Sequence, residues 1–247
     1  MQRYFVNQMN KEEATITGDD VHHITRVMRM SVGDPIYCCY NGRVALCAIT
    51  EITNDTVLAN VVEWVENTSE LPIKVCIASG LPKGDKLEYV IQKGTELGAI
   101  EFVPFVAERS IVKWDEKKGH KKVERFGKIA KEAAEQSHRA TVPTITKPLS
   151  FRELLSYSRS YTYKIVAYEE DAKRGERSNL AKVLSKAKHG DSLFVVIGPE
   201  GGLTEKEVST LIENDFISAS FGPRILRTET APLYVLSAVS YHFELAR

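Results

Sequence analysis

Two glycine-containing segments near the C-terminal end of the chain hold side chains that could bind a small ligand. The first, 198–202, reads GPEGG and follows the wholly apolar run 193–197. Its glycines allow a ligand to approach the backbone closely, and Glu200 would repel a phosphate but suit a cationic or hydroxyl-bearing group. The spacing matches neither a phosphate-binding loop nor a dinucleotide fingerprint, which disfavours a nucleotide-dependent metabolic enzyme. Taken alone, the segment is equally typical of a structural turn.

The second segment, 221–232, reads FGPRILRTETAP and has a high density of functional side chains. These are Arg224, Arg227, Thr228, Glu229 and Thr230. Arg227 stays protonated, so it could stabilise developing negative charge but could not accept a proton. Glu229 is a candidate general base, although an acid at the start of a helix is also favourable to the helix dipole. Ile225 and Leu226 stand between the arginines and are expected to be buried.

Both segments are expected to follow a strand and to precede a helix. In open α/β sheets, ligands bind beyond the carboxyl ends of the strands. We therefore expect 198–202 and 221–232 to form the walls of one shared pocket.

A small cationic face is expected near the N-terminus. Residues 20–30 have the period of a helix, with Asp19 as its N-cap. The apolar stripe consists of Val21, Ile24, Val27 and Met28. His22, Arg26 and Arg29 would share one polar face, at positions i, i+4 and i+7. This face could contact phosphates or could be an ordinary amphipathic surface, and both interpretations stay open.

A second polar face is expected in 131–139, KEAAEQSHR. Glu132, Gln136 and Arg139 stand at i, i+4 and i+7, opposite the alanines of the helix predicted over 121–138. The face either points to a substrate or is the solvated side of a helix that packs on the core.

The distribution of charge is more informative than its sum. The formal net charge is zero, which by itself does not favour a nucleic-acid-binding protein. Residues 1–70 carry five Lys and Arg against ten Asp and Glu, whereas 109–139 carry ten against five, together with His120 and His138. The second stretch, and above all 109–131, is a local basic zone that either attracts phosphate or forms a solvated helix face.

The cysteines predict a reducing compartment. Cys38, Cys39, Cys47 and Cys76 form no C-x-x-C pair and have no histidine at metal-ligand spacing, so we expect reduced, structural thiols and no metal site. Cys38 and Cys39 should point to opposite faces of a strand. The N-terminal sequence lacks the apolar region of a signal peptide, and no apolar run approaches the roughly 18 residues that span a bilayer. We therefore expect a cytoplasmic protein without a membrane partner.

The organisation of the chain changes near residue 70. Residues 1–66 favour a small β-barrel or sandwich with one helix, in which Asn41 and Gly42 form a hairpin turn between strands 35–40 and 44–51. The polar stretch 66–72 is the expected linker. Beyond it we expect strands at 73–79, 100–106, 163–168, 193–197 and 217–221, alternating with helices at 85–97, 121–138, 180–188, 204–213 and 231–245. This alternation predicts an α/β domain with a largely parallel sheet.

Four motifs together resemble those of the SPOUT superfamily of RNA methyltransferases and, within it, the 16S ribosomal RNA uridine-N3 methyltransferases. They are His22-His23 with Arg26 and Arg29, LPKGDKLEYVIQKGTELG at 81–98, EAAEQSHR at 132–139, and IGPEGG at 197–202 with ILRTETA at 225–231. The motifs span nearly the whole chain in the order of the family. Phe221 and Met28 stand where the family more often has Leu, and both remain apolar.

The resemblance implies a fold and an activity. Residues 1–70 would form a PUA-like β-barrel that helps to bind RNA. Residues 73–247 would form the methyltransferase domain, an α/β fold whose last segments thread a trefoil knot. The chain would be a homodimer that uses S-adenosylmethionine to methylate N3 of a specific uridine in the 16S rRNA of the small ribosomal subunit.

The resemblance also implies site residues. The expected cofactor-binding residues are Ile197, Gly198, Pro199, Glu200, Gly201, Gly202, Phe221, Gly222, Ile225, Leu226, Arg227, Thr228, Thr230 and Ala231. The expected RNA-binding residues are His22, His23, Arg26, Arg29, Lys83, Lys93, Gln136 and Arg139. The expected catalytic residues are Arg227, Glu229 and Arg139. The loop after Tyr168 is expected to form a third wall of the pocket.

Two alternatives stay open at this stage. One is a SPOUT methyltransferase that acts on another ribosomal or transfer RNA base. The other is a non-catalytic RNA-binding factor for ribosome assembly, against which the intact segments 198–202 and 226–231 count.

Overall fold

The computed structural model describes residues 1–66, 69–112, 114, 116–168 and 179–246. The chain divides into two compact units. Unit 1 comprises Met1–Glu70 and Lys131–Val142, and unit 2 comprises Leu71–Ala130 and Pro143–Arg247. The segment Lys131–Val142, which the sequence interpretation placed in the second domain, thus groups with the N-terminal strands.

Unit 1 is built on one curled sheet of six strands in the order β1-β4-β5-β6-β3-β2. The strands are β1 (Arg3–Phe5), β2 (Gln8–Met9), β3 (Glu13–Thr17), β4 (Pro35–Tyr40), β5 (Arg43–Ile52) and β6 (Thr56–Val65). The expected hairpin between β4 and β5 is confirmed, and Asn41 and Gly42 have φ values of 48° and 74°. Two positive φ values are what a two-residue turn needs to match the twist of its strands.

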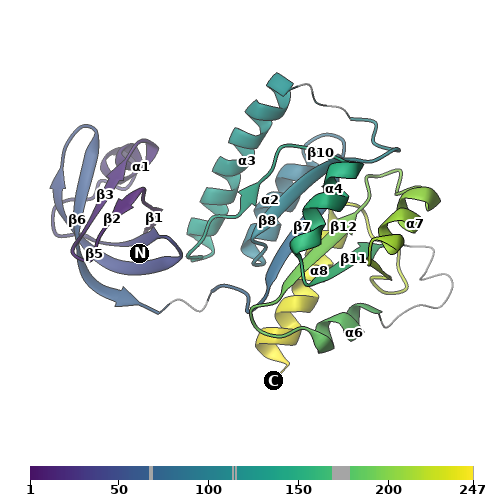
Figure 1. Cartoon of the computed structure of the whole chain (residues 1–247). Coiled ribbons are helices and arrows are strands. Elements are labelled where there is room, and N and C mark those ends of the chain that lie inside the picture. Colours follow the sequence, from purple (N-terminus) through teal and green to yellow (C-terminus); the bar gives the residue numbers. More distant parts are fainter. Residues whose placement is uncertain (67–68, 113, 115, 169–178, 247) are drawn as a thin grey trace. The chain divides into compact units, whose positions relative to one another are not determined.

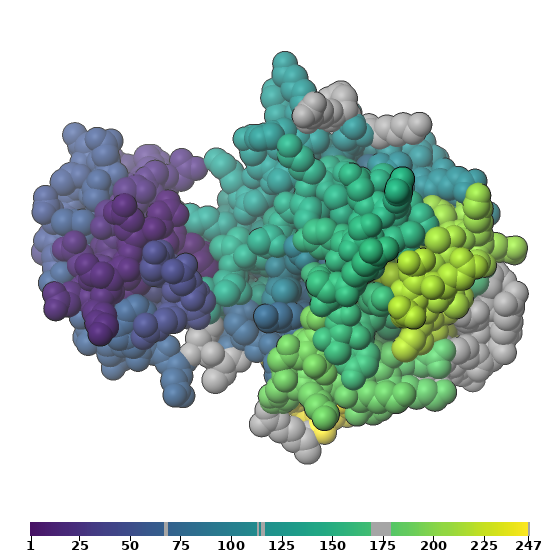
Figure 2. Space-filling model, viewed as in Figure 1, coloured from purple at the N-terminus to yellow at the C-terminus, as the bar shows by residue number. Residues whose placement is uncertain are grey.

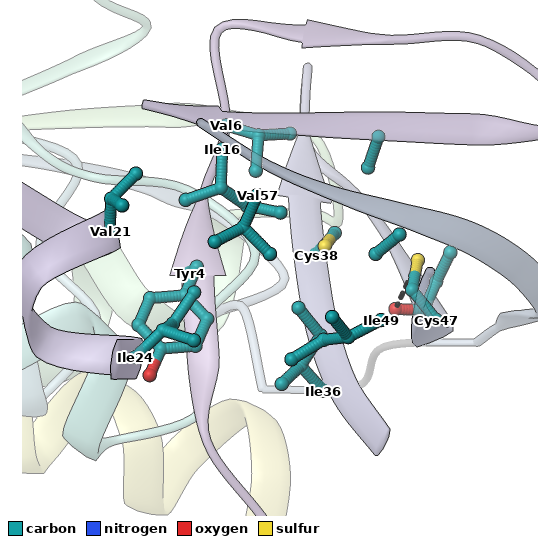
Figure 3. Close-up of a cluster of buried hydrophobic side chains, with 13 residues drawn as sticks. Tyr4, Val6, Ile16, Val21, Ile24, Ile36, Cys38, Cys47, Ile49 and Val57 are labelled. Atoms are coloured by element: carbon teal, nitrogen blue, oxygen red, sulfur yellow. Dashed lines mark hydrogen bonds between the residues drawn. The ribbon is translucent and has the colours of Figure 1, made fainter. Parts of the chain in front are cut away.

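The core of unit 1 lies on one face of this sheet. Ile36 and Cys38 of β4 pack there against residues of β3, β5 and β6 (Figure 3). Cys39 points to the other face and packs with Val44 and Ala140, so the expectation for the two adjacent cysteines is confirmed. All four cysteines are buried and free.

The N-terminal helix is shorter and more irregular than its sequence pattern predicts. It consists of α1 (Asp19–His22) and the π-helical turn η1 (His23–Val27). Val21 and Ile24 are buried, but Val27 is 58% exposed and Met28 39% exposed, so the expected stripe is wrong in its second half. A π turn has more residues per turn than an α-helix, which rotates later residues off the buried face. The N-cap is Gly18 rather than Asp19.

Unit 2 contains a second sheet, in which every recorded strand pair is parallel. Its order is β10-β8-β7-β12-β11-β13, with β9 paired to β8. The strands are β7 (Lys74–Gly80), β8 (Glu101–Val106), β9 (Thr144–Ile145), β10 (Leu149–Ser150), β11 (Tyr163–Ala167), β12 (Ser192–Ile197) and β13 (Ile217–Ala219). These parallel pairings confirm the expected α/β sheet. The strands could be recognised in the sequence because crossover helices bury both faces of such a sheet, which favours continuous apolar strands.

Helices cover both faces of this sheet (Figure 1). On one face, Leu154 of α4 (Phe151–Tyr157) and Leu211 of α7 (Glu205–Glu213) belong to the same buried cluster as Phe194. In Figure 2, the atoms of these two segments lie at the surface of the near side, in green and yellow-green. Phe102 lies on the opposite face, close to α2 (Lys86–Glu96) and α8 (Thr230–Ser240). The remaining helical elements are α3 (Glu116–Gln136), η2 (Ser158–Ser160), α6 (Asn179–Lys186) and η3 (Tyr241–Leu245).

Several short elements were not predicted from the sequence. Strands β1, β2, β3, β9 and β10 were not predicted, nor was α4, although Ser150 and Glu153 form its capping box. The trefoil knot implied by the resemblance stays a prediction. In the described part of the chain, no helix combines the length and apolarity needed to cross a membrane.

A partly buried charge cluster joins α3 to α1 within unit 1. Lys131 Nζ lies 2.6 and 2.7 Å from the two carboxylate oxygens of Asp20 and 3.6 Å from Glu135 Oε1. That Glu135 oxygen is buried and has no hydrogen-bond partner within the described part of the chain. Burial raises the pKa of Glu135 to about 7, with Asp20 adding to the rise and Lys131 opposing it.

We predict that Glu135→Gln makes the protein more stable than the wild type at alkaline pH. The folded-state pKa of Glu135, about 7, lies above its ordinary value of 4.5. As pH rises from 4.5 through 7, the buried carboxyl must ionise, and the folded state loses stability relative to the unfolded state. The variant should gain on the order of 1–3 kcal/mol of unfolding free energy at about pH 8 and nothing at about pH 4. Urea unfolding across pH measures this, with Glu63→Gln, at an exposed position of β6, as control. Parallel pH dependence of wild type and variant would contradict the assignment.

Candidate functional site

A pocket of about 640 Å³ lies at the carboxyl ends of the strands of unit 2. Loops after five parallel strands contribute to it, because parallel strands all end at one edge of their sheet. Of the residues expected to bind a cofactor, those at 197–202, 221–222, 225–228 and 231 line this pocket, and Thr230 does not. Glu229 also lines it. Their role as ligand contacts stays a prediction.

The two glycine-containing segments are bonded to each other. The Thr228 hydroxyl donates a hydrogen bond of 2.7 Å to the carbonyl oxygen of Gly198. The end of β7 packs equally closely on the first loop, since a Cβ on Gly80 would lie 2.5 Å from Pro199 Cδ. A Cβ on Gly198 would approach Gly202 and Leu203 to 3.0 Å. Both segments line the same pocket, so the expectation that they share one pocket is confirmed.

The first segment, 198–202, is also held by helix α7, which follows it, and by the loop after β8. Thr204 and Glu207 form the predicted capping box at the start of α7. The buried Glu207 carboxylate also accepts the backbone N–H of Glu108 at 2.8 Å. Next to it, Arg109 donates from Nη1 to the Gly201 carbonyl at 3.1 Å. Arg109 was not predicted, because nothing in its local sequence pairs it with a loop 92 residues away.

A charged cluster lies in the wall of the pocket. Lys86 Nζ donates to Glu200 Oε1 at 2.8 Å and lies 3.6 Å from Glu229 Oε2. The backbone N–H of Lys83 also donates to Glu200 Oε1, at 3.0 Å. Partial burial raises the pKa of Glu200, but the hydrogen bonds from Lys86 and from backbone N–H groups outweigh it and lower the pKa overall. The same hydrogen bond has the opposite effect on its donor, and it raises the pKa of Lys86.

This cluster changes the interpretation of Glu200. The sequence suggested that its charge would meet a cationic or hydroxyl-bearing ligand. In the structure, Lys86 already neutralises that charge, so Glu200 also anchors its loop to the start of α2. Lys86 was not singled out from the sequence, although it stands within the motif at 81–98.

The second segment is anchored at its ends and exposed in its middle. Phe221 is buried and its ring stacks on Tyr234 with centroids 6.0 Å apart. Ile225 is 72% exposed, so the expectation that it would be buried is wrong for the single chain. Arg224 and Arg227 are exposed beside it. The loop therefore offers both apolar and cationic side chains to a ligand or another chain.

The residues expected to bind RNA fall into different environments. His22, Arg26, Arg29 and Lys83 are exposed. Arg29 follows the helix at φ 53°, so it does not continue the helical face as expected. His23 is half-buried, with Nδ1 3.0 Å from the Tyr4 hydroxyl, and Lys93 is ion-paired with Glu96 at 2.7 Å.

Arg139 contradicts both roles that were expected of it. Helix α3 ends at Gln136, His138 has φ 60°, and the turn directs Arg139 away from the exposed face of Glu132 and Gln136. The Arg139 side chain is 1% exposed and lies 2.5 Å from Glu70 Oε2. A guanidinium buried in this ion pair is not available to RNA or to a reacting base, and Arg139 instead joins the end of α3 to Glu70 within unit 1.

The basic zone 109–131 is partly neutralised. Arg125 is ion-paired with Glu88 at 2.8 Å, and Lys131 with Asp20. Lys117 and Lys121 are exposed on α3. Residues 113 and 115 of this zone lie outside the described residues.

Comparison with known proteins shows the family. Residues 69–240 match the RNA methyltransferase domain, and residues 16–62 match the RNA methyltransferase PUA domain. Ribosomal RNA small subunit methyltransferase E of Bacillus subtilis is 55% identical over 253 residues, covering 100% of this chain and 99% of that protein. The chain belongs to the ribosomal RNA small subunit methyltransferase E family.

Solved structures agree with the family's fold. The Neisseria gonorrhoeae methyltransferase E bound to S-adenosylmethionine has a TM-score of 0.83 and 26% identity, over 97% of both chains. A Legionella pneumophila methyltransferase in complex with the same cofactor has a TM-score of 0.81 and 25% identity, over 96% of both chains. The match to the PUA domain lies within unit 1, and the match to the methyltransferase domain spans the parallel sheet of unit 2 together with Lys131–Val142 of unit 1.

We predict that Thr228→Val weakens the binding of S-adenosylmethionine, the ligand of those two relatives. The change keeps the shape of the side chain but removes the bond that joins the two loops, leaving the Gly198 carbonyl without its partner. A bond of this kind contributes about 0.5–1.5 kcal/mol, so the dissociation constant should rise about two- to twelvefold. Titration calorimetry measures it, with Thr210→Val as control, a partly exposed position of α7 whose hydroxyl donates to the Lys206 carbonyl of the same helix. Equal affinity in both variants would show that the bond does not shape the pocket.

Proposed function

We propose that this chain transfers the methyl group of S-adenosylmethionine to N3 of a uridine in 16S ribosomal RNA. The observation that carries the proposal is the pocket at the strand ends, whose two principal loops are held together by the Thr228–Gly198 hydrogen bond. The family membership and the cofactor-bound relatives support the same cofactor and RNA class. The choice of uridine N3 rests on the motif resemblance.

The chemistry sets two requirements beyond alignment of donor and acceptor. The sulfonium methyl group is already activated, so positioning supplies much of the rate, up to about 7–11 kcal/mol. Uridine N3 carries a proton at neutral pH and is a poor nucleophile until that proton leaves. The site therefore needs a base for the N3 proton and a positive group for the charge that develops on O2 or O4.

Glu229 and Arg227 fit these two tasks. Glu229 lines the pocket, and its Oε2 has no hydrogen-bond partner among the described residues, which supports this carboxylate as the acceptor of the N3 proton. Arg227 lines the same pocket and carries a permanent charge. As N3 forms its bond to the methyl carbon, the carbon–sulfur bond breaks, and S-adenosylhomocysteine leaves as a neutral thioether.

The decisive experiment compares rRNA from cells with and without this protein. We expect mass spectrometry to show the loss of one N3-methyluridine from 16S rRNA and its return with the wild-type gene. Arg227→Ala and Glu229→Gln should fail to restore it, with rates lowered about 100-fold or more in purified assays. Binding of S-adenosylmethionine without any change in methylated uridine would point to another RNA base. Absence of cofactor binding would end the proposal.

The RNA is proposed to contact the exposed cations of unit 1 and the basic zone. Changing Arg26 and Arg29 to Ala should weaken RNA binding, because fewer phosphates are then neutralised and fewer counterions are released. The slope of log affinity against log salt should fall by about one for each arginine that meets a phosphate, while cofactor affinity stays unchanged. Filter binding at several salt concentrations measures this. An unchanged RNA affinity would remove this helix from the proposed interface.

We also propose that the chain acts as a homodimer in the cytoplasm, where its rRNA substrate is made. Exposed apolar side chains of unit 2 support a partner chain, among them Ile225, Tyr241 and Leu245. Such side chains are commonly covered by an interface when they form a contiguous patch. Light scattering that gives a monomer mass would remove the second copy from the proposal.

A further inference from the structure

We propose that unit 1 carries a binding site for an unpaired guanine base of RNA, formed by Arg43, Trp64 and Glu66. The inference rests on the proposed function in one respect, namely that the substrate is RNA. The motif resemblance assigned no role to these three residues. They lie at the paired ends of β5 and β6 and in the chain that directly follows β6.

The site is built on a cation that lies on an aromatic ring. Arg43 opens β5 directly after the hairpin turn, and Trp64 lies near the end of β6. Ala45 is opposite Trp64 in the register of these strands, so Arg43, two residues before Ala45, is on the same face of the sheet as Trp64. The Arg43 Cζ lies over the Trp64 ring, 3.9 Å from its centroid. The ring therefore supports the guanidinium from one side.

A small pocket lies beside this cation and ring. Its volume is about 270 Å³, whereas the pocket in unit 2 has about 640 Å³. Because Trp64 also packs against the core of unit 1, its ring forms a fixed wall. A pocket of this size next to a flat cation suits one planar ring system better than a whole cofactor. The residues that line it are Gly42, Arg43, Val44, Trp64, Val65 and Glu66.

The Arg43 guanidinium is available for further contacts. The residue is exposed, and within the described part of the chain its guanidinium makes no hydrogen bond and no ion pair. Arg125, by contrast, is held by Glu88. A guanidinium that lies on a ring keeps its N–H donors at its edge and offers its outer face to a second ring. Bases of single-stranded RNA stack on guanidinium planes and on aromatic rings in this way.

Glu66 gives the pocket a preference for guanine. Its carboxylate accepts N–H groups and repels phosphate, so a base fits beside it better than the RNA backbone does. Guanine carries two adjacent donors, N1–H and N2–H, on one edge, and the acceptors O6 and N7, with which arginine pairs, on another. Adenine, cytosine and uracil have no edge with two adjacent donor groups. Because the donor edge of guanine is also its base-pairing edge, the bound guanine must be unpaired.

The charge balance of the N-terminal residues also favours a base over a phosphate as the ligand. Residues 1–70 carry ten Asp and Glu against five Lys and Arg, so they attract the RNA backbone weakly. Stacking acts on the neutral base and does not need a positive surface. The site would thus hold one single-stranded nucleotide of the substrate, whereas Arg26 and Arg29 are proposed to meet phosphates.

The test measures the fluorescence of Trp64 in the full chain. The sequence has two tryptophans, so Trp114→Phe leaves Trp64 as the single fluorescent indole. The probes are a single-stranded uridine oligonucleotide with one central guanine, matched strands with adenine or cytosine in its place, and guanosine monophosphate. Because Trp64 lines the pocket, a base bound there should quench it. We expect the guanine strand to do so at a concentration at least about fivefold lower than the other probes.

Variants in this background separate the roles of the two charged residues. Arg43→Ala should weaken binding of the guanine strand about fivefold or more, and Arg43→Lys should recover only part of the loss, because it keeps the charge but not the plane. Glu66→Gln should lower the preference for guanine while the strands still bind. Arg152→Ala, at an exposed arginine of α4, is the matched control and should bind as the parent does. Circular dichroism checks that each variant is folded.

Four results would overturn the inference. They are equal quenching by all strands, unchanged affinity in a folded Arg43→Ala, full recovery in Arg43→Lys, or guanosine monophosphate binding as tightly as the guanine strand, which would place a free nucleotide in the pocket. If Arg43→Ala does not fold, a folded Glu66→Gln with undiminished guanine preference has the same consequence. Failure of the proposed function looks different, because this quenching needs neither cofactor nor methyl transfer. A chain without methyltransferase activity that still selects guanine would end the proposed function and leave the inference in place.

Discussion

The hydrogen bond from Thr228 to the Gly198 carbonyl is the contact on which the candidate site depends. It joins two loops that lie 30 residues apart in sequence and that follow different strands of the sheet. The first of these loops already packs on the end of β7, where Gly80 leaves no room for a Cβ beside Pro199. The segments that follow β12 and β13 and the end of β7 are therefore held together before any ligand binds. Such preorganisation reduces what binding must spend on ordering the loops.

The same packing explains how several charges can share the wall of one pocket. Glu200 would be repelled by Glu229 if each carboxylate stood alone. Lys86 at the start of α2 provides an ammonium for Glu200, and Lys83 in the turn before α2 provides a backbone N–H. The second carboxylate, Glu229, therefore meets a nearly neutral pair rather than a bare anion. Placing α2 after β7, and β7 beside β12, is therefore as important to the site as the loops themselves.

Sequence patterns predicted those features whose cause is local. The Asn41-Gly42 turn, the Thr204–Glu207 capping box and the apolar strand before Gly198 are each set by neighbours within a few residues, and each is present. The roles of Arg139 and Lys86 could not be predicted in the same way. Their partners, Glu70 and Glu200, lie 69 and 114 residues away, and helical periodicity says nothing about such pairs. The helical pattern also led us to expect that the helix continues past Gln136. In the structure the helix ends there, and His138, in a left-handed backbone conformation, redirects the chain.

Counts of charged residues overestimate the positive surface for a similar reason. The basic zone has an excess of Lys and Arg in sequence, yet Arg125 and Lys131 are held by Glu88 and Asp20. Each such ion pair removes a charge that could otherwise displace a counterion from RNA. With a formal net charge of zero, the proposed attraction between this protein and RNA depends on local groups of exposed cations, and Arg26 and Lys121 are among the exposed cations. Recognition by shape and by a few phosphates follows from that distribution more readily than long-range steering.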